Sequence, residues 1–225
     1  MVLGGCAVDT HEETPQFLLI VRERLRPGTD EAYDKNESQL ADACARLKCP
    51  HPYLALASVA APREVWWLNA FVSQEERDGL GAAYARNEPL MAELQPLGKR
   101  KEDFREALVT TMTEYRLDLS GRAVLRFAGA RFFVIDTEGE SAGAVFQSSD
   151  GGRFVIGAAS SRAAAEEIAT QSGSAAIVLA VQPQWSFPAE AWIDADPDFW
   201  NSNTVARNRR GTPDAESPKR GGPTR

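Results

Sequence analysis

The sequence has few of the residues that perform most catalytic and metal chemistry. Its 225 residues include two histidines and three cysteines. The cysteines, Cys6, Cys44 and Cys49, are odd in number and lack metal-ligand spacing, so we expect neither a disulfide framework nor a metal site. Free cysteines are typical of a reducing compartment, and we therefore expect a cytoplasmic protein.

Long apolar runs are also missing. No segment approaches the roughly 18 uninterrupted apolar residues of a membrane span. The string Leu3-Gly4-Gly5-Cys6 resembles the lipobox of a bacterial lipoprotein, but no basic region or apolar region precedes it. It does not work as a signal in this form, although a start codon upstream of Met1 would change that expectation.

Familiar catalytic signatures are absent too: GxGxxG, a P-loop, GxSxG, paired CxxC and a His-rich metal set. Charge excludes a further class of ligand. Residues 201–225 carry six basic and two acidic side chains, a charge of +4, which leaves −11 on the rest because the total is −7. The negative charge of residues 1–200 repels phosphate backbones, which argues against nucleic acid as a ligand. The basic tail is expected to be disordered, with an acidic partner as the alternative.

The sequence does contain alternating strand and helix patterns, and these predict an α+β fold. Residues 1–15 form a loose leader, and residues 16–120 predict a ferredoxin-like βαββα unit. Its expected elements are a strand at Phe17–Arg24, a helix from Thr29, strands at Tyr53–Leu56 and Glu64–Phe71, a helix opened by a Ser73 and Glu76 capping box, and further helix after Lys101 up to Tyr115. A strand is then expected at Tyr115–Leu119.

The pattern becomes strand-rich beyond Gly121, which places a boundary there. Residues 121–200 predict the order β-β-β-α-β, a degenerate second half without its first helix. The expected elements are strands at Arg131–Asp136, Ala144–Gln147 and Arg153–Ile156, a helix capped by Ser160 or Ser161, and a strand at Ala175–Val181.

Three strings together carry a family resemblance: Val21-Arg-Glu-Arg-Leu-Arg-Pro-Gly28, Tyr53-Leu-Ala-Leu-Ala-Ser58 and Glu64-Val-Trp-Trp-Leu68. Over about residues 16 to 120 the chain resembles the dimeric α/β-barrel superfamily, near uncharacterised bacterial antibiotic-biosynthesis-monooxygenase (ABM) and NIPSNAP-like proteins. The resemblance implies two ferredoxin-like sheets closed into a barrel, across a homodimer or between fused halves, with a ligand between sheet and helices.

The superfamily includes cofactor-free monooxygenases, isomerases, haem proteins and proteins without known activity, so fold alone does not choose a reaction. Its haem-degrading branch uses an Asn, Trp and His set. Trp67 matches the Trp, but the first strand lacks the Asn and the second helix lacks the His. The related YCII-like group relies on a His and Asp pair, and the second half of this chain has no His.

Glu37 and His51 are the candidate catalytic residues. Glu37 lies on the buried stripe of the first helix with Tyr33, Leu40, Cys44 and Leu47, so it is expected to face the sheet. A buried carboxylate must be paired or have a raised pKa, and either state suits proton transfer. The expected partner is Arg22, and a purely structural ion pair is the alternative. His51, between two prolines, is a candidate acid or base, or else a surface turn residue.

The candidate ligand-binding residues are Arg22, Tyr33, Trp67, Asn69 and Asn87. Strand alternation places Trp67, Asn69 and Phe71 on one face, an aromatic wall with one amide that suits a flat organic molecule. The other face, with Trp66 and Leu68, is expected to pack under helices. Ordinary core or dimer-interface packing is the alternative for the aromatic wall.

Three functions therefore remain open. The first is a small-molecule-binding α/β barrel, a cofactor-free monooxygenase or isomerase acting on an aromatic or apolar metabolite. The second is a non-catalytic binding or assembly module, in which Glu37 and Arg22 close into a salt bridge with no cavity beside Trp67. The third is a haem protein, for which Cys49-Pro50 offers a weak thiolate signature.

Overall fold

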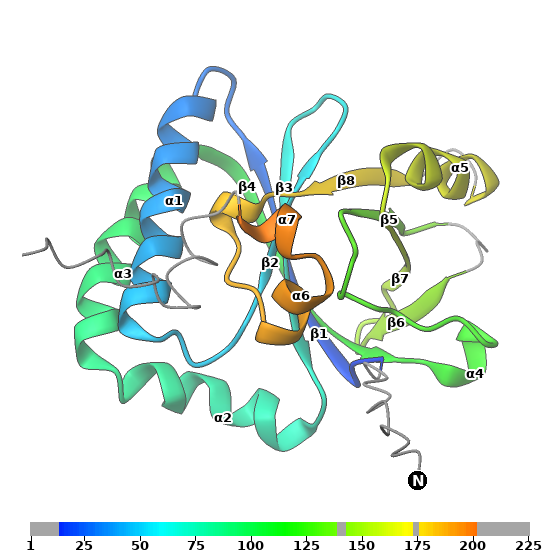
Figure 1. Ribbon diagram of the computed structural model, residues 1–225, viewed down its shortest axis with the longest axis horizontal. Coiled ribbons are helices and arrows are strands. Elements are labelled where there is room, and N and C mark those ends of the chain that lie inside the picture. The colour runs from blue at the N-terminus through cyan, green and yellow to red at the C-terminus, as the bar shows by residue number, and fades with distance from the viewer. Residues whose placement is uncertain (1–13, 139–142, 173–175, 202–225) are drawn as a thin grey trace, which may run out of the picture.

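Eight antiparallel strands form a closed barrel in the part of the chain that the computed structural model describes, residues 14–138, 143–172 and 176–201. Their order around the barrel is β1-β3-β2-β8-β5-β7-β6-β4 (Figure 1). The strands are β1 (Phe17–Leu25), β2 (Leu54–Ser58), β3 (Glu64–Phe71), β4 (Arg105–Tyr115), β5 (Phe132–Asp136), β6 (Ala144–Ser148), β7 (Arg153–Ala159) and β8 (Ile177–Val181).

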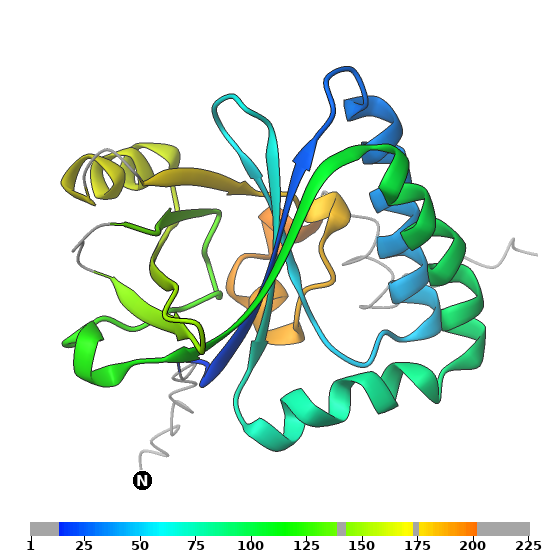
Figure 2. The same ribbon diagram turned by 180° about the vertical axis from the view of Figure 1, so that it is seen from behind.

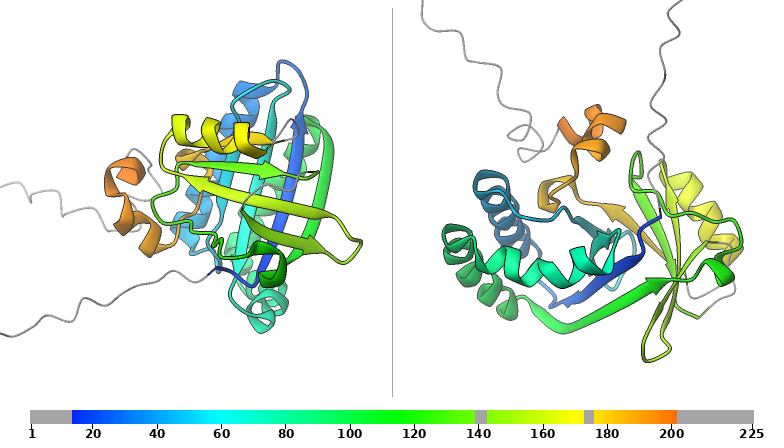
Figure 3. Two further views of the ribbon diagram at one scale, coloured as in Figure 1. Left: turned by 90° about the vertical axis from the view of Figure 1, so that its right-hand side faces the viewer. Right: turned by 90° about the horizontal axis from the view of Figure 1, so that it is seen from below.

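Helices connect these strands and cover parts of the barrel. They are α1 (Asp30–Leu47), α2 (Gln74–Ala85), α3 (Glu88–Arg100), α4 (Leu117–Ser120), α5 (Arg162–Ser172), α6 (Glu190–Ala195) and α7 (Pro197–Asn201), with the 3-10 turns η1 (Lys101–Asp103) and η2 (Pro183–Trp185). Seen from below, α1, α2 and α3 lie on one side of the molecule and α5 lies on the other (Figure 3). None of the helices within the described ranges is long and apolar enough to cross a bilayer.

The two halves of the barrel repeat one strand order. In the first half β1 pairs with β3 and β4, and β2 pairs with β3. In the second half β5 pairs with β7 and β8, and β6 pairs with β7. The seams are equivalent, because β2 pairs with β8 and β4 pairs with β6. The barrel therefore closes within a single chain.

The barrel interior is a packed core shared by both halves. Alternate residues of the strands point inward, among them Leu18, Trp66, Phe133 and Phe146, all fully buried. Trp200 and its neighbours on α6 and α7 join the same cluster. Trp66 and Leu68 thus lie inside the barrel, not under helices as expected from the sequence, because closure gives the sheet an inner face that a flat sheet lacks.

Helices α1 and α3 lie over the outer face of the first half-sheet. Tyr33 of α1 packs there with Val65 and Trp67, and Trp185 of η2 contacts the Tyr33 ring with centroids 5.6 Å apart. Trp185 Nε1 also donates to Asp34 Oδ1 at 2.7 Å, so the second half is tied to α1. On the opposite side α5 packs on β5, β7 and β8 through a small cluster around Ala165.

Most strand predictions are confirmed, but the prediction of helix after Lys101 is wrong. Between Lys101 and Tyr115 only the short turn η1 (Lys101–Asp103) is helical. Residues Arg105–Tyr115 form β4, which pairs with β1 along its length (Figure 2). The apolar residues Leu108 and Met112 have helical spacing, yet Val109 and the threonines around them favour a strand. The expected strand at Tyr115–Leu119 is also wrong, because Leu117–Ser120 is the short helix α4.

Local signals correctly predict several element ends. The Ser73 hydroxyl accepts from the Glu76 amide at 3.2 Å, and the Glu76 carboxylate accepts from the Val72 amide at 2.9 Å, which fixes the start of α2. Thr29 precedes α1 as predicted, but its hydroxyl donates to the carbonyl of Arg26 at 2.8 Å and does not cap the helix.

Candidate functional site

A pocket of about 250 Å³ lies between the outer face of the first half-sheet and the helices that cover it. Strands β1 and β3 supply its floor, and α1, α2, α3 and η1 supply its walls. The lining residues are Val21, Glu23, Glu37, Leu40, Cys44, Tyr53, Trp67, Asn69, Tyr84, Leu94 and Lys101. Most of this surface is apolar or aromatic, and the charged groups gather at one end.

Glu37 is the unusual acidic group of this pocket. Its side chain is fully buried on α1. Oε1 lies 3.4 Å from Lys101 Nζ and accepts a weak bond from Asn36 Nδ2 at 3.4 Å, whereas Oε2 is buried without a hydrogen-bond partner. Burial raises the pKa of Glu37 to about 7; the Lys101 charge opposes this rise and the Glu23 charge adds to it.

Glu23, on β1, is a second buried carboxylate, but unlike Glu37 it has several hydrogen-bond donors and a lowered pKa. Its carboxylate accepts hydrogen bonds from Tyr33 Oη at 2.5 Å, Arg105 Nη1 at 2.8 Å and Trp67 Nε1 at 3.5 Å. Lys101 Nζ lies 3.2 Å from the same carboxylate. Burial alone would raise the pKa of Glu23, but the Lys101 charge and these donors outweigh it, and the pKa falls below its usual value. Glu23 is therefore ionised at neutral pH.

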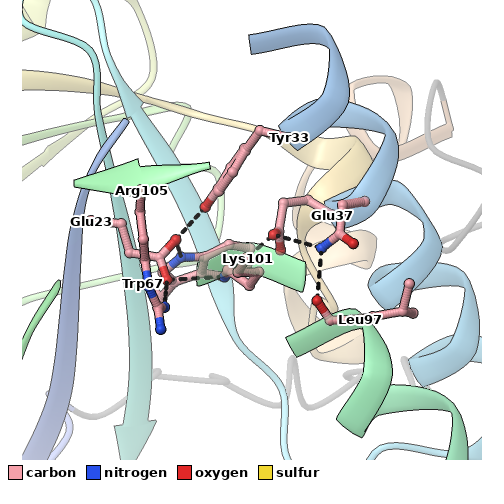
Figure 4. A network of polar contacts seen from close by, with 8 residues as sticks. Glu23, Tyr33, Glu37, Trp67, Leu97, Lys101 and Arg105 are labelled. Carbon is pink, nitrogen blue, oxygen red and sulfur yellow. Dashed lines mark hydrogen bonds and ion pairs between the residues drawn. The ribbon is translucent and has the colours of Figure 1, made fainter. Parts of the chain in front are cut away.

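Lys101 lies between the two carboxylates (Figure 4). Its ammonium also lies 4.3 Å from the centre of the Trp67 ring, a cation–π contact that holds the side chain against the pocket wall. Tyr33 stays a neutral donor, because burial and the charges of Glu37 and Glu23 raise its pKa far above 10. Lys101, Arg105 and the Tyr33 hydroxyl thus hold the two carboxylates in place.

This arrangement separates two carboxylates by environment. One is held ionised by several donors, and the other has a pKa near neutral pH and one free oxygen. Pairs of titratable groups whose environments push their pKa values apart are typical of acid and base assignments. The site can therefore accept or donate a proton at Glu37 close to pH 7.

The structure places three of the predicted site residues at this pocket. Glu37, Trp67 and Asn69 all line it, and Tyr33 lies behind it on Glu23. Arg22 does not meet Glu37, so that predicted pair is wrong. Arg22 instead forms a bidentate salt bridge to Glu64, with Nε–Oε2 and Nη2–Oε1 distances of 2.9 and 2.6 Å. Arg22 lies on the barrel-interior side of β1, because strand alternation sends it away from Glu23.

His51 and Asn87 lie apart from the pocket lining. The His51 ring is buried, stacks on Phe71 with centroids 4.5 Å apart, and has Nδ1 3.4 Å from Glu76 Oε1. Burial lowers the pKa of His51, and Glu76 only partly opposes this. Asn87 does not point into the cavity as expected: it begins α3, accepting from the Leu90 amide and donating to the Leu47 carbonyl at 2.7 Å.

The expectation of unpaired cysteines is wrong for two of the three. Cys44 and Cys49 form a disulfide across the end of α1, with Cα atoms 4.6 Å apart, and Cys6 lies outside the described residues. The Cys49 sulfur is consequently not a thiolate in this form, so it does not fit a haem axial ligand. Among the described residues no cluster of His, Cys, Asp and Glu is placed to hold a metal ion.

Sequence reasoning missed Glu23, Lys101 and Arg105. Glu23 lies at the end of a predicted strand, Lys101 immediately precedes a stretch that the pattern predicts to be helical, and Arg105 falls within that stretch. The available signal was Glu23 on the same strand face as Val21, which alternation places under the first helix. Only the pairing of β1 with β4 brings Arg105 to Glu23.

No protein-family model matches the sequence, and no curated protein matches it significantly. Several solved structures resemble the fold, among them the following three. A monooxygenase candidate from Fusobacterium nucleatum is 8% identical, with a TM-score of 0.47, over 75% of this chain and 93% of that one. A chlorite dismutase candidate is 11% identical (TM-score 0.44; 80% and 98% covered), and an anthrone oxidase-like protein is 9% identical (TM-score 0.42; 76% and 92% covered). Likenesses this distant carry no inference about activity.

Proposed function

We propose that this protein binds a small, flat, largely apolar molecule in the Glu37 pocket and moves a proton on it. The observation that carries the proposal is the buried, unpartnered Oε2 of Glu37, a residue that lines the pocket beside an aromatic wall. A buried acceptor without a partner costs about 1–3 kcal/mol, which a ligand donor would recover. The fold we propose for it is a fused pair of ferredoxin-like halves of the α/β-barrel type.

The charges around the pocket select the chemical class of ligand. Glu23 and Glu37 disfavour a carboxylate or phosphate ligand, and the Lys101 ammonium between them disfavours a cation. A neutral molecule with an acidic O–H or C–H next to a carbonyl fits both conditions. When Glu37 takes that proton, negative charge passes to the ligand and Lys101 is close enough to stabilise it.

Two reactions follow naturally from this first step. In an isomerisation, the proton returns from Glu37 to a different atom of the ligand. In a cofactor-free monooxygenation, the ligand anion reacts with O2, so that a CH2 group becomes a carbonyl and the second oxygen atom leaves as water. Both begin with Glu37 as the base, and neither needs a group that the chain does not supply apart from O2.

A non-catalytic binding or assembly module is the second candidate. Its distinguishing feature was a closed Glu37 and Arg22 salt bridge with no cavity beside Trp67. Arg22 instead bonds Glu64, and Trp67 lines the pocket, which favours the ligand-binding function. Haem binding has less support, since Cys49 is bonded to Cys44.

Proton exchange on a probe ketone tests the proposal without knowledge of the natural substrate. The probe is 2-tetralone, a bicyclic apolar ketone with an acidic CH2 group, incubated with the protein in D2O and followed by NMR. We expect the protein to accelerate deuterium incorporation, and Glu37→Gln to reduce that acceleration by about 10²–10⁴-fold, the usual contribution of a positioned base.

The matched control is Glu31→Gln, an exposed glutamate on the same helix, which should leave the exchange rate unchanged. Exchange should also rise with pH around 7 as Glu37 loses its proton, and then level off. Exchange no faster than in buffer, or equal rates for wild type and Glu37→Gln, would reject Glu37 as the base.

A further inference from the structure

The Cys44–Cys49 disulfide forms part of the pocket wall. Cys44 lines the cavity, whereas Cys49 lies behind it. Both residues are largely buried, with 3% and 7% of their surface exposed. The Tyr53 hydroxyl lies 3.8 Å from Cys44 Sγ, and Tyr53 is itself a pocket residue. Cys44 thus belongs to the cavity wall next to Tyr53.

The disulfide also joins the two walls of the cavity. Cys44 belongs to the last turn of α1, the helix that supplies Glu37 and Leu40, and Cys49 begins the segment that leads to Tyr53. Between them the chain turns through Lys48, a non-glycine residue in the left-handed region with φ of 61°. The amide of Cys49 bonds the carbonyl of Cys44 at 2.9 Å, so one hydrogen bond and one covalent bond close the same turn.

We propose that Cys44–Cys49 is a reversible redox site whose co-reactant, a low-molecular-weight thiol, enters through the Glu37 pocket. The thiolate of the first thiol attacks Cys44 Sγ, the S–S bond breaks, and Cys49 leaves as a thiolate that takes a proton. A second thiol attacks the mixed disulfide, which releases the oxidised co-reactant as its own disulfide and Cys44 as a thiol. Two electrons pass to the protein, and the two protons come from the two thiols.

Access through the pocket couples the redox state to ligand binding. A molecule in the cavity covers Cys44 Sγ and prevents attack, and reduction releases the link between α1 and the Tyr53 wall. Thiol access to Cys44 does not require proton transfer by Glu37, so the two proposals are tested independently.

The test measures the reduction rate of the folded protein in a Cys6→Ser background. Dithiothreitol is added at several concentrations, thiols are trapped with N-ethylmaleimide, and the adducts are counted by mass spectrometry. We expect the rate to be proportional to dithiothreitol concentration, because the small thiol attacks the native state. Leu94→Trp, which fills the cavity from α3, should slow reduction by about tenfold or more since access controls thiol exchange.

Val72→Trp is the matched control, because Val72 is 68% exposed and is not a lining residue. It should react within about twofold of the parent protein. A rate that becomes independent of dithiothreitol concentration would mean that the protein must open first, and it would overturn the proposal without any variant. Equal rates for folded Leu94→Trp and the parent would overturn it as well.

Discussion

At the scale of residues, the two buried glutamates show how partners decide the charge state. Both carboxyls lie beside Lys101, but Glu23 also receives a tyrosine hydroxyl and an arginine, whereas Glu37 keeps one oxygen without a partner. Desolvation is the largest effect on the pKa of both carboxyls, but at Glu23 the Lys101 charge and the donors together outweigh it, whereas at Glu37 they do not. The sequence predicted that Glu37 is buried, because helical spacing reveals a face. It could not predict the competing cations, Arg105 and Lys101, which come from β4 and η1.

Glu37 should make stability depend on pH in a defined window. Its pKa is raised from 4.5 to about 7 in the folded protein, so its protonated form favours folding at low pH and this contribution is lost as pH rises through 7. Relative to Glu37→Gln, the wild-type protein should lose at most about 3 kcal/mol of unfolding free energy between pH 4.5 and 7. Urea unfolding at several pH values measures this difference, and a pH-independent difference would contradict it.

Lys101 should hold the Glu37 pKa down. Its charge opposes the effect of burial, so Lys101→Met should raise the pKa of Glu37 further and move the pH midpoint of 2-tetralone exchange upward. The control is Lys99→Met, an exposed lysine in the last turn of α3, which should leave the midpoint in place. A midpoint that stays or falls in Lys101→Met would show that another group controls Glu37.

At the scale of elements, tertiary pairing decides the cases that local pattern leaves open. Helix α1 and strands β1 and β3 follow from periodicity, because each has a clear apolar face. Strand β4 does not, since two of its apolar residues, Leu108 and Met112, are partly exposed and share a helical spacing. Its partners β1 and β6 fix it as a strand. The break between α2 and α3 at Asn87 depends on a contact with Leu47 that is far away in sequence.

The end of α1 offers a stabilising substitution. Lys48 has φ of 61°, a left-handed conformation that favours glycine after a helix. Lys48→Gly should raise the free energy of unfolding by about 0.5–1 kcal/mol because it removes the steric cost of Cβ there. Lys99→Gly, within α3, should lower it by a similar amount since glycine is unfavourable in a helix. Chemical denaturation compares the two, and destabilisation by Lys48→Gly would refute the expectation.

At the scale of the whole molecule, one barrel core joins two halves with the same strand order. The order β-β-β-α-β could be predicted for the second half because its strands and turns are locally marked. The resemblance implied a closed barrel, but the sequence could not choose between closure across a homodimer and closure between fused halves, since that depends on the seams β2–β8 and β4–β6. The same closure explains why Trp66 faces inward while Trp67 faces the pocket.

A shared core predicts cooperative unfolding. Trp200 is 2% exposed and packs in the cluster that contains residues of both halves. Trp200→Ala should cost about 3–5 kcal/mol and lower the stability of both halves together in one transition. Val124→Ala, at a site that is 55% exposed, is the control and should have little effect. Hydrogen exchange would contradict a shared core if β1 and β3 kept their protection while β5 and β7 lost it.

The pKa of the Glu37 carboxyl is the most direct test of the account as a whole. Carbon-13 NMR of protein labelled at glutamate side-chain carboxyls follows each group through a pH titration, and the spectrum of Glu37→Gln identifies the Glu37 signal by its loss. The account predicts that this signal titrates near pH 7, well apart from the exposed glutamates. Titration near 4.5 together with the exposed groups would show that Glu37 is an ordinary carboxylate and would remove the basis for proton transfer in this pocket.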